Sequence, residues 1–308
     1  MVNVVAAHCS FLQWLMKITA GVKPYTVEIH PGTHMRFWVP SYAISSPNLV
    51  SKPKKPVVVL LHGFCGDGIM TWQFQVASLS KHYAVYVPDF LFFGGSFTDR
   101  PNRSLEFQAE CLAVGLEKLR VEKCVLVGFS YGGMVAFKMA EMYPDMVYGM
   151  VISGAVVAIK ESIIMEIVNG VGFSSCSEML MPMTVDGVKG LLSLGIHKNI
   201  SFPNRFHNDF LKVMFSNRKE RCELLEALLI SYKHINIPIF SQRIHLLWGE
   251  NDKIFKKELA HNMKELLGNK TTFEGIKNAG HLVHMERPCA FNTSLNHFLS
   301  SLLFPTPN

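Results

Sequence analysis

Short apolar runs alternate with longer segments of helical periodicity along most of the chain. The run Val57-Val58-Val59-Leu60-Leu61 is apolar throughout and largely β-branched, which is typical of a strand buried on both faces. Similar runs predict strands over residues 83–88, 123–128, 147–153, 244–248 and 271–276. Helices are predicted between them, over residues 71–81, 105–119, 134–142, 256–267 and 289–303. This alternation predicts an α/β fold with a doubly wound, mostly parallel sheet.

The alternation stops between residues 155 and 238. That stretch is rich in Met, Ile, Leu and good helix formers, and it includes a predicted helix over residues 218–231. We expect residues 155–238 to form a helical cap that is inserted into the core. The core then comprises residues 26–154 and 239–308, and it begins with a hairpin around Pro31-Gly32.

Residues 1–25 are expected to form a separate amphipathic segment. The uncharged stretch 2–16 is shorter than the roughly 20 residues of a spanning helix, and no basic region precedes it as in a signal peptide. If this segment is helical, four apolar residues share one face: Phe11, Leu12, Leu15 and Ile18. Two interpretations stay open, namely packing onto the protein's own body and peripheral contact with a membrane surface.

Composition narrows the class of protein. The 308 residues are 49% hydrophobic, which is enough for a sizeable core, and the formal charge is only +6. The basic residues are scattered apart from a short run at 52–55, so we expect no nucleic-acid partner. Seven cysteines without a C-x-x-C spacing indicate a reduced, cytoplasmic protein. No metal or cofactor is expected, and the oligomeric state stays open.

Ser130 is the strongest candidate for chemistry. It stands in Gly128-Phe129-Ser130-Tyr131-Gly132, directly after a predicted strand and directly before a predicted helix. A strand that turns so sharply into a helix strains the serine backbone, and only small flanking residues leave room for the turn. The pattern therefore predicts a nucleophile elbow.

A serine nucleophile needs a histidine to take its proton and a carboxylate to orient that histidine. Among thirteen histidines, His281 lies in the loop after the strand at 271–276, and we prefer it to His284, three residues further on. The loop beyond the strand at 244–248 offers Asp252 as the acid, with Glu250 as a weaker candidate. The catalytic residues are thus predicted as Ser130, Asp252 and His281, in the order expected for this architecture.

Two backbone N–H groups must stabilise the oxyanion that forms when a serine attacks a carbonyl group. We expect them from Tyr131, which follows the nucleophile, and from Phe64 in the loop after residue 61. His62 is expected to hold this loop. Cys65 lies in the same loop and is an alternative nucleophile, although a small structural residue is the interpretation we prefer.

These residues resemble the motifs of the α/β-hydrolase superfamily, and the resemblance extends over residues 26–303. The matching pieces are His62-Gly63-Phe64, Asp89 with Gly94 and Ser96, the elbow around Ser130, Gly249-x-x-Asp252 and Gly280-His281. Phe92 departs from the pattern, because many relatives have glycine there. More narrowly, the segment 88–94 and the long middle region resemble plant monoacylglycerol-lipase-like proteins. That group includes esterases of specialised metabolism, some of which release a product that then loses CO₂.

The resemblance implies a serine carboxylic-ester hydrolase that acts on a small or medium apolar ester. We expect Phe92, Phe93 and Met181 to line its substrate pocket, although such residues can equally belong to the core. An acyltransferase and a ligand-binding receptor on the same scaffold remain alternatives. Haloalkane and epoxide chemistry is disfavoured, since relatives with those activities have an aspartate where this chain has Ser130.

Overall fold

A central, mostly parallel sheet organises the protein. The computed structural model describes residues 2–46, 49–158, 161–198, 200–231 and 237–304. The parallel strands are β5 (Val57–Leu61), β6 (Ala84–Pro88), β8 (Cys124–Phe129), β9 (Val147–Ser153), β10 (Arg243–Gly249) and β11 (Thr271–Ile276). They follow the order β6-β5-β8-β9-β10-β11. The six predicted strands are confirmed, with each end within one residue of its predicted place.

An antiparallel hairpin extends the sheet at the β6 edge. It consists of β1 (Val22–His30) and β2 (Thr33–Pro40), and β2 pairs with β6 and with the short β7 (Phe97–Thr98). The hairpin thus begins four residues before the predicted start of the core. A 3₁₀ turn (Ser41–Ala43) and the pair β3 (Ile44–Ser46) and β4 (Leu49–Val50) follow it.

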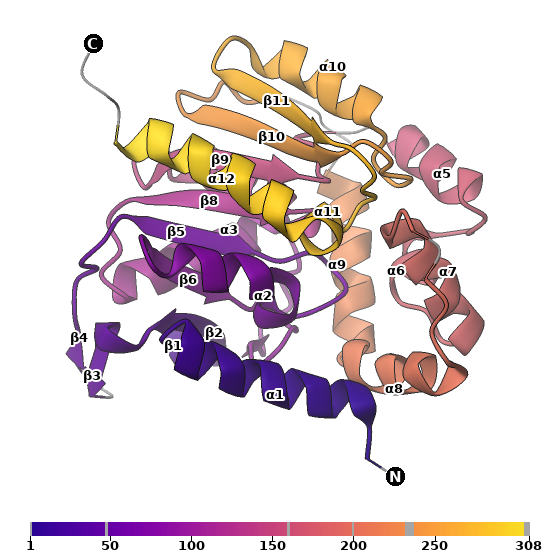
Figure 1. Cartoon of the computed structure of the whole chain (residues 1–308), viewed down its shortest axis with the longest axis horizontal. Helices are drawn as coiled ribbons and strands as arrows, with labels where there is room; N and C mark the ends of the chain where they lie inside the picture. Colours follow the sequence, from indigo (N-terminus) through magenta and orange to yellow (C-terminus); the bar gives the residue numbers. More distant parts are fainter. Residues whose placement is uncertain (1, 47–48, 159–160, 199, 232–236, 305–308) are drawn as a thin grey trace.

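Helices cover both faces of the sheet (Figure 1). Val57, Val59 and Leu61 face a core shared with α3 (Leu105–Lys118), α4 (Tyr131–Met142) and α10 (Lys257–Leu267). Val58 and Leu60 face the opposite core, which α1 (Val4–Thr19), α2 (Gly68–Leu79) and α12 (Pro288–Leu303) complete. The alternating side chains of one apolar strand therefore supply both layers, as the doubly wound prediction requires.

In the described residues between β9 and β10 there are five helices. They are α5 (Glu161–Gly170), α6 (Cys176–Leu180), α7 (Val185–Gly195), α8 (Asn204–Met214) and α9 (Arg218–Ser231), and we call them the insertion. The insertion lies beyond the carboxyl ends of the parallel strands (Figure 1), where α/β folds place their sites. Residues 232–236 of the predicted cap and 305–308 of the predicted core lie outside the described residues.

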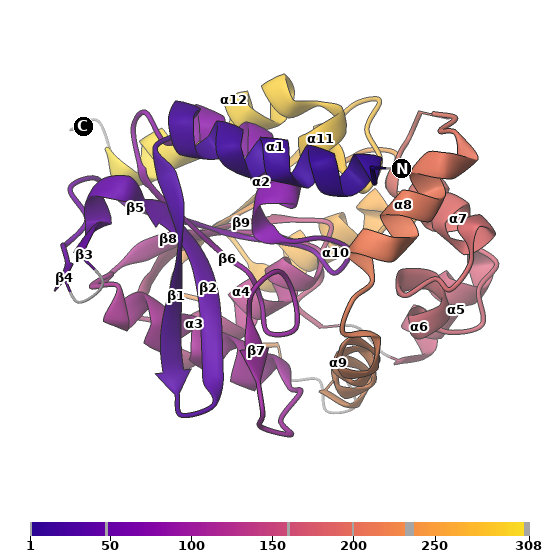
Figure 2. The same cartoon turned by 90° about the horizontal axis from the view of Figure 1, so that it is seen from below.

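The first helix packs differently from its prediction. Side chains of Val5, Leu12 and Met16 are buried, whereas Phe11 and Ile18 are 55% and 59% exposed. Leu15 is partly buried against the same core as Leu12. The predicted apolar face is therefore correct for Leu12 and Leu15 and wrong for Phe11 and Ile18, because α1 has two apolar stripes and only one contacts the body. Figure 2 shows α1 running along α2, with its first turn beside α8. No helix in the described parts of the chain is long and apolar enough to cross a membrane.

Candidate active site

Ser130 lies at a strained turn between β8 and α4. Its φ of 51° and ψ of −121° are unfavourable for any residue other than glycine. Such a backbone conformation typically costs about 1–3 kcal/mol. A Cβ atom at Gly128 would lie 2.6 Å from the Gly133 Cα, and one at Gly132 would lie 2.3 Å from the Leu61 carbonyl oxygen. The two flanking glycines therefore permit the turn.

His281 and Asp252 form a buried pair next to this turn. The His281 Nδ1–H group donates to Asp252 Oδ2 at 2.8 Å, and the side chains are 8% and 1% exposed. Asp252 Oδ1 accepts from the Ile254 and Phe255 amides at 2.8 and 2.9 Å. A carboxylate held on both oxygens fixes the imidazole with its proton on Nδ1, and Nε2 is then available to accept a proton.

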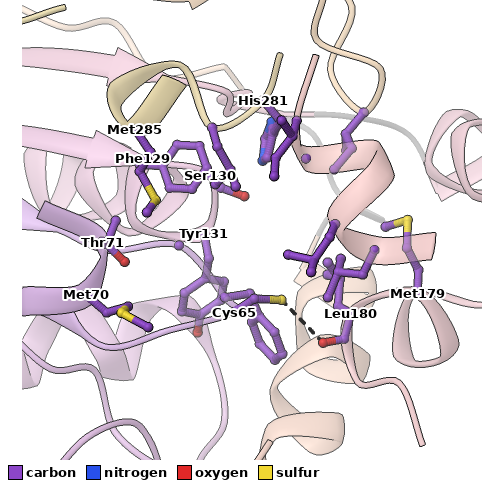
Figure 3. A pocket seen from close by; sticks show the side chains of 18 of the residues that line it. Cys65, Met70, Thr71, Phe129, Ser130, Tyr131, Met179, Leu180, His281 and Met285 are labelled. Atoms are coloured by element: carbon purple, nitrogen blue, oxygen red, sulfur yellow. Dashed lines mark hydrogen bonds between the residues drawn. The ribbon is translucent and has the colours of Figure 1, made fainter. Parts of the chain in front are cut away.

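Ser130 and His281 line the same cavity. Figure 3 shows the two side chains next to each other at one side of the cavity, with Met179 and Leu180 across the open space. The structure thus brings the predicted nucleophile, histidine and acid together from the ends of β8, β11 and β10. A serine beside an imidazole that is oriented by a carboxylate can perform nucleophilic acyl transfer.

His284, the competing histidine, occupies a different environment. It belongs to the short helix α11 (Val283–Glu286), is fully buried, and neither of its ring nitrogens has a polar partner among the described residues. Burial lowers the pKa of His284 from 6.5 to about 3. The Phe129 ring packs against both histidines, with centroid distances of 4.4 Å to His284 and 4.8 Å to His281. Of the two histidines, His281 is the one that is bonded to Asp252.

Gly154 is part of the site, and the sequence did not reveal it. It follows β9 with a φ of +55°, and a Cβ atom there would lie 2.7 Å from Cε1 and 2.8 Å from Nδ1 of His281. The imidazole occupies the space that any other residue would fill with a side chain. The sequence indicated only that the strand ending at Ser153 is followed by a glycine and not by a carboxylate residue.

The two predicted oxyanion donors lie on adjacent segments. Tyr131 is the first residue of α4, so its amide is at the positive end of a helix. Phe64 follows β5, and its ring meets the Tyr131 ring edge to face at 5.6 Å. Gly63 brings this loop against the elbow, since a Cβ atom there would lie 3.4 Å from the Ser130 Cβ.

His62 holds the loop in this position. Its Nδ1–H group donates to the Gly63 carbonyl oxygen at 2.7 Å, and its Nε2 accepts from the Phe90 amide at 3.0 Å. Complete burial lowers the pKa of His62 to about 4, so the ring is neutral at ordinary pH. Both nitrogens thus join backbone segments, as the structural role of His62 requires.

Cys65 is not suited to act as a nucleophile. Its thiol donates to the Leu180 carbonyl oxygen at 3.4 Å, and burial raises the pKa of this thiol to about 12. A cysteine reacts as its thiolate, which is scarce here at neutral pH. The thiol instead connects the loop after β5 with helix α6 of the insertion.

The cavity measures about 370 Å³ and is almost entirely apolar. Its lining comes from the core loops, from the insertion and from the first turns of α1, where Val4, Val5 and His8 contribute. None of the described residues that line it carries a carboxylate, an ammonium or a guanidinium group. Such a cavity suits a neutral, largely apolar ligand.

The three predicted pocket residues lie elsewhere. Phe92, Phe93 and Met181 are buried, and the cavity is lined by Met179 and Leu180 instead. Phe92 has a φ of 73°, a conformation that favours glycine, so this chain keeps the backbone path that suits the glycine of many relatives and holds a strained phenylalanine there. Its carbonyl oxygen accepts from Arg221 Nε at 3.0 Å, so this strained residue connects the core with α9.

Comparison with known proteins agrees with this architecture. Residues 56–175 match the family described as alpha/beta hydrolase fold. Epoxide hydrolase 3 of Xenopus tropicalis is 27% identical over 269 residues, which cover 80% of this chain and 72% of that protein. Human epoxide hydrolase 4 is 33% identical over 102 residues, which are 32% of this chain and only 27% of the human protein.

Two solved structures extend the comparison to nearly the whole chain. A putative lipase of Acinetobacter baumannii superposes with a TM-score of 0.78 at 20% identity, covering 97% of each chain. Naproxen esterase of Bacillus subtilis gives a TM-score of 0.67 at 19% identity and covers 97% of this chain and 99% of its own. The protein therefore has the alpha/beta hydrolase fold, and its residues 56–175 match the family of that description.

Proposed function

We propose that the protein is a serine carboxylic-ester hydrolase. The observation that carries this proposal is the His281–Asp252 pair, joined at 2.8 Å, beside a serine on a strained elbow at the edge of an apolar cavity. Each part of this arrangement has a role in cleaving an ester, and together they form the set that acyl transfer requires.

In the proposed mechanism, Ser130 Oγ attacks the ester carbonyl carbon while His281 Nε2 takes the hydroxyl proton. The carbonyl oxygen becomes an oxyanion, which the Phe64 and Tyr131 amides stabilise. Collapse of this intermediate breaks the bond to the alcohol, and His281 returns the proton to the departing oxygen. Water, activated by the same imidazole, then hydrolyses the acyl-enzyme and releases the acid. Asp252 keeps the imidazole in the required tautomer and stabilises its charged form.

The expected substrate is a neutral ester of small or medium size. The apolar lining and the absence of charged groups among the described lining residues disfavour a substrate with a carboxylate or phosphate in the cavity. Monoacylglycerols and the methyl or acetyl esters of plant specialised metabolism both fit this description. A β-dicarbonyl acid released from such an ester would then lose CO₂ without further help from the protein.

Epoxide opening is not the activity that the site favours, although both relatives compared above are named epoxide hydrolases. Attack of Ser130 on an epoxide carbon would leave an ether on the enzyme, and water does not readily cleave an ether. A carboxylate nucleophile would leave an ester, which water can release. The chain has serine at this position, which suits a carbonyl substrate.

We also propose that the outer stripe of α1 contacts a lipid surface. Phe11, Trp14 and Ile18 are more than half exposed along one side of the helix, and α1 carries Lys17 but no carboxylate. Aromatic and aliphatic side chains on a helix of this kind partition into the headgroup region. Since Val4, Val5 and His8 line the cavity, this contact would bring its lining close to membrane-dissolved esters.

Labelling of the nucleophile tests the proposed activity. A fluorophosphonate probe should label the parent protein, and Ser130→Ala should abolish both labelling and cleavage of short p-nitrophenyl esters. Competition by monoacylglycerols, or by methyl and acetyl esters, would then identify the preferred class. Full ester turnover by Ser130→Ala would refute the mechanism, whereas transfer of the acyl group to an added alcohol would indicate an acyltransferase. Slow single turnover with a retained product would indicate a receptor.

A further inference from the structure

Glu286 joins the histidine loop to the insertion. It ends α11, five residues after His281, and its Oε2 accepts from the Gly280 amide at 2.6 Å. Its Oε1 accepts from the His197 and Lys198 amides at 2.9 and 3.3 Å. One carboxylate thus binds the residue before the histidine and the segment that follows α7.

The two segments are also in direct backbone contact. The Leu282 amide donates to the Gly195 carbonyl oxygen at 2.8 Å. A Cβ atom at Gly280 would lie 2.8 Å from the His197 nitrogen and 3.0 Å from the Gly195 oxygen. Glycine before the histidine is therefore required for this close approach. The residues on both sides of His281 are fixed to the end of α7.

The loop that carries the acid contacts the same place. Lys253, directly after Asp252, donates from Nζ to the Ser193 carbonyl oxygen near the end of α7 at 2.8 Å. Carbonyl groups in the last turn of a helix have no partners within it and attract cations. The end of α7 thus contacts the loops of both His281 and Asp252.

This part of the insertion also faces the substrate cavity. Leu191, Leu192, Gly195 and Ile196 all line the cavity, together with Leu282 from the histidine loop. A ligand that occupies the cavity therefore contacts the end of α7. The segment after α7 is in turn hydrogen-bonded through Glu286 to the loop that carries His281.

We infer that Glu286 is a positioning residue that couples the placement of α7 to the placement of His281. This inference rests on the proposed function. Bonds from amides to a carboxylate are charge-assisted and stronger than bonds between neutral groups. Without them, the segment after α7 and the loop of His281 can move separately, and a shift of about 1 Å in a catalytic group can lower turnover by about 100-fold.

The test compares Glu286→Gln and Glu286→Ala with a matched control, Glu178→Gln. Glu178 is a carboxylate of the insertion that accepts from the Ser174 amide at 2.8 Å in an exposed turn. Active sites are counted by fluorophosphonate labelling, so that misfolded protein is left out of the turnover number. Turnover per labelled site should fall about 10-fold in Glu286→Gln and more in Glu286→Ala, while Glu178→Gln should match the parent.

The KM values provide a second readout. Esters with long acyl chains reach α7 and should show a larger increase in KM than acetyl esters in both Glu286 variants. A residue that only stabilises the fold would lower the melting temperature without this difference between substrates. Turnover per site and KM within twofold of the parent for both variants would overturn the inference.

Amide hydrogen exchange tests the coupling by Glu286 without relying on the proposed activity. In Glu286→Gln, amide exchange should accelerate together in residues 195–198 and 280–282, whether or not the protein cleaves esters. Acceleration in only one of these segments, or in neither, would show that Glu286 does not couple them. Failure of the parent to react with the fluorophosphonate would overturn the proposed activity and leave the exchange result intact.

Discussion

Gly154 lies directly against His281, so that a methyl group at Gly154 would come within 2.7 Å of the imidazole Cε1. We expect Gly154→Ala to displace the ring from the line between Asp252 and Ser130. Turnover should fall at least 10-fold, because proton transfer requires hydrogen-bond distance. Ester kinetics combined with a melting curve would measure this effect.

The control for this variant is Gly268→Ala. Gly268 also has a positive φ, +82°, but nothing lies within 4 Å of a Cβ atom at that position. Backbone strain alone should therefore lower stability in both variants, while only Gly154→Ala loses activity. Equal turnover in the two variants would mean that the close approach to His281 has no catalytic consequence.

Replacing Asp252 by asparagine should leave the fold in place but remove most activity. The carboxylate accepts hydrogen bonds on both oxygens, from His281 and from the Ile254 and Phe255 amides. An asparagine that keeps the amide contacts would point its NH₂ group at His281 and favour the wrong tautomer. Turnover should fall by about 10³–10⁴-fold. A loss below 10-fold would argue against Asp252 as the orienting acid.

Stability should decrease on acidification through the buried histidines. Burial holds the pKa of His284 at about 3 and that of His62 at about 4 in the folded protein, below the ordinary 6.5. Between these values and pH 6.5 the unfolded chain binds more protons, so stability falls with falling pH by up to about 1.4 kcal/mol per group and pH unit. Above pH 6.5 this effect is absent.

His284→Leu tests the histidine contribution. Chemical denaturation from pH 7 to pH 4 should give a shallower loss of stability for the variant than for the parent, since one titrating group is gone. The His62 contribution should persist in both proteins. Parallel curves across this range would contradict the assignment of His284 as a neutral buried group.

The lipid contact proposed for α1 can be followed by tryptophan fluorescence. Trp14 is 54% exposed, whereas Trp38, Trp72 and Trp248 are 1%, 0% and 0% exposed. A blue shift on adding vesicles of phosphatidylcholine with phosphatidylglycerol would therefore report on Trp14. We expect such a shift, and we expect Phe11→Ser with Ile18→Ser to weaken it. Leu12→Ser is unsuitable as a control because Leu12 packs inside, so Tyr148→Ser, an exposed aromatic on β9, serves instead.

The strands of the core could be predicted because each one is visible as a short apolar run in the sequence. The run 57–61 is apolar at every position and is buried at every position, since a parallel strand between two helical layers has no solvent face. The elbow glycines and the loops with Asp252 and His281 come directly after strands in the sequence, so predicting the strands also pointed to the residues of the candidate site.

Other features depend on neighbours that the sequence does not identify. Periodicity found apolar residues in α1, but it could not decide whether the stripe with Leu12 and Met16 or the stripe with Phe11 and Ile18 contacts the body. Phe92 and Met179 are both apolar residues near the site, and only the packing separates a buried core residue from one that lines the cavity. Gly154 matters because it leaves space for the imidazole of His281, which is 127 positions later in the chain, so the sequence around Gly154 does not reveal this contact.

The bond between the Val4 amide and Asp209 Oδ2 has a consequence for biosynthesis. These residues are 205 positions apart, and at roughly 5–20 residues per second a ribosome takes roughly 10–40 s to make the chain between them. During that time α1 has no α8 to bind, and the part of the cavity formed by Val4, Val5 and His8 cannot exist. The residues of α1 thus reach their final place only after α8 has left the ribosome, and the part of the cavity that they line forms no earlier than that.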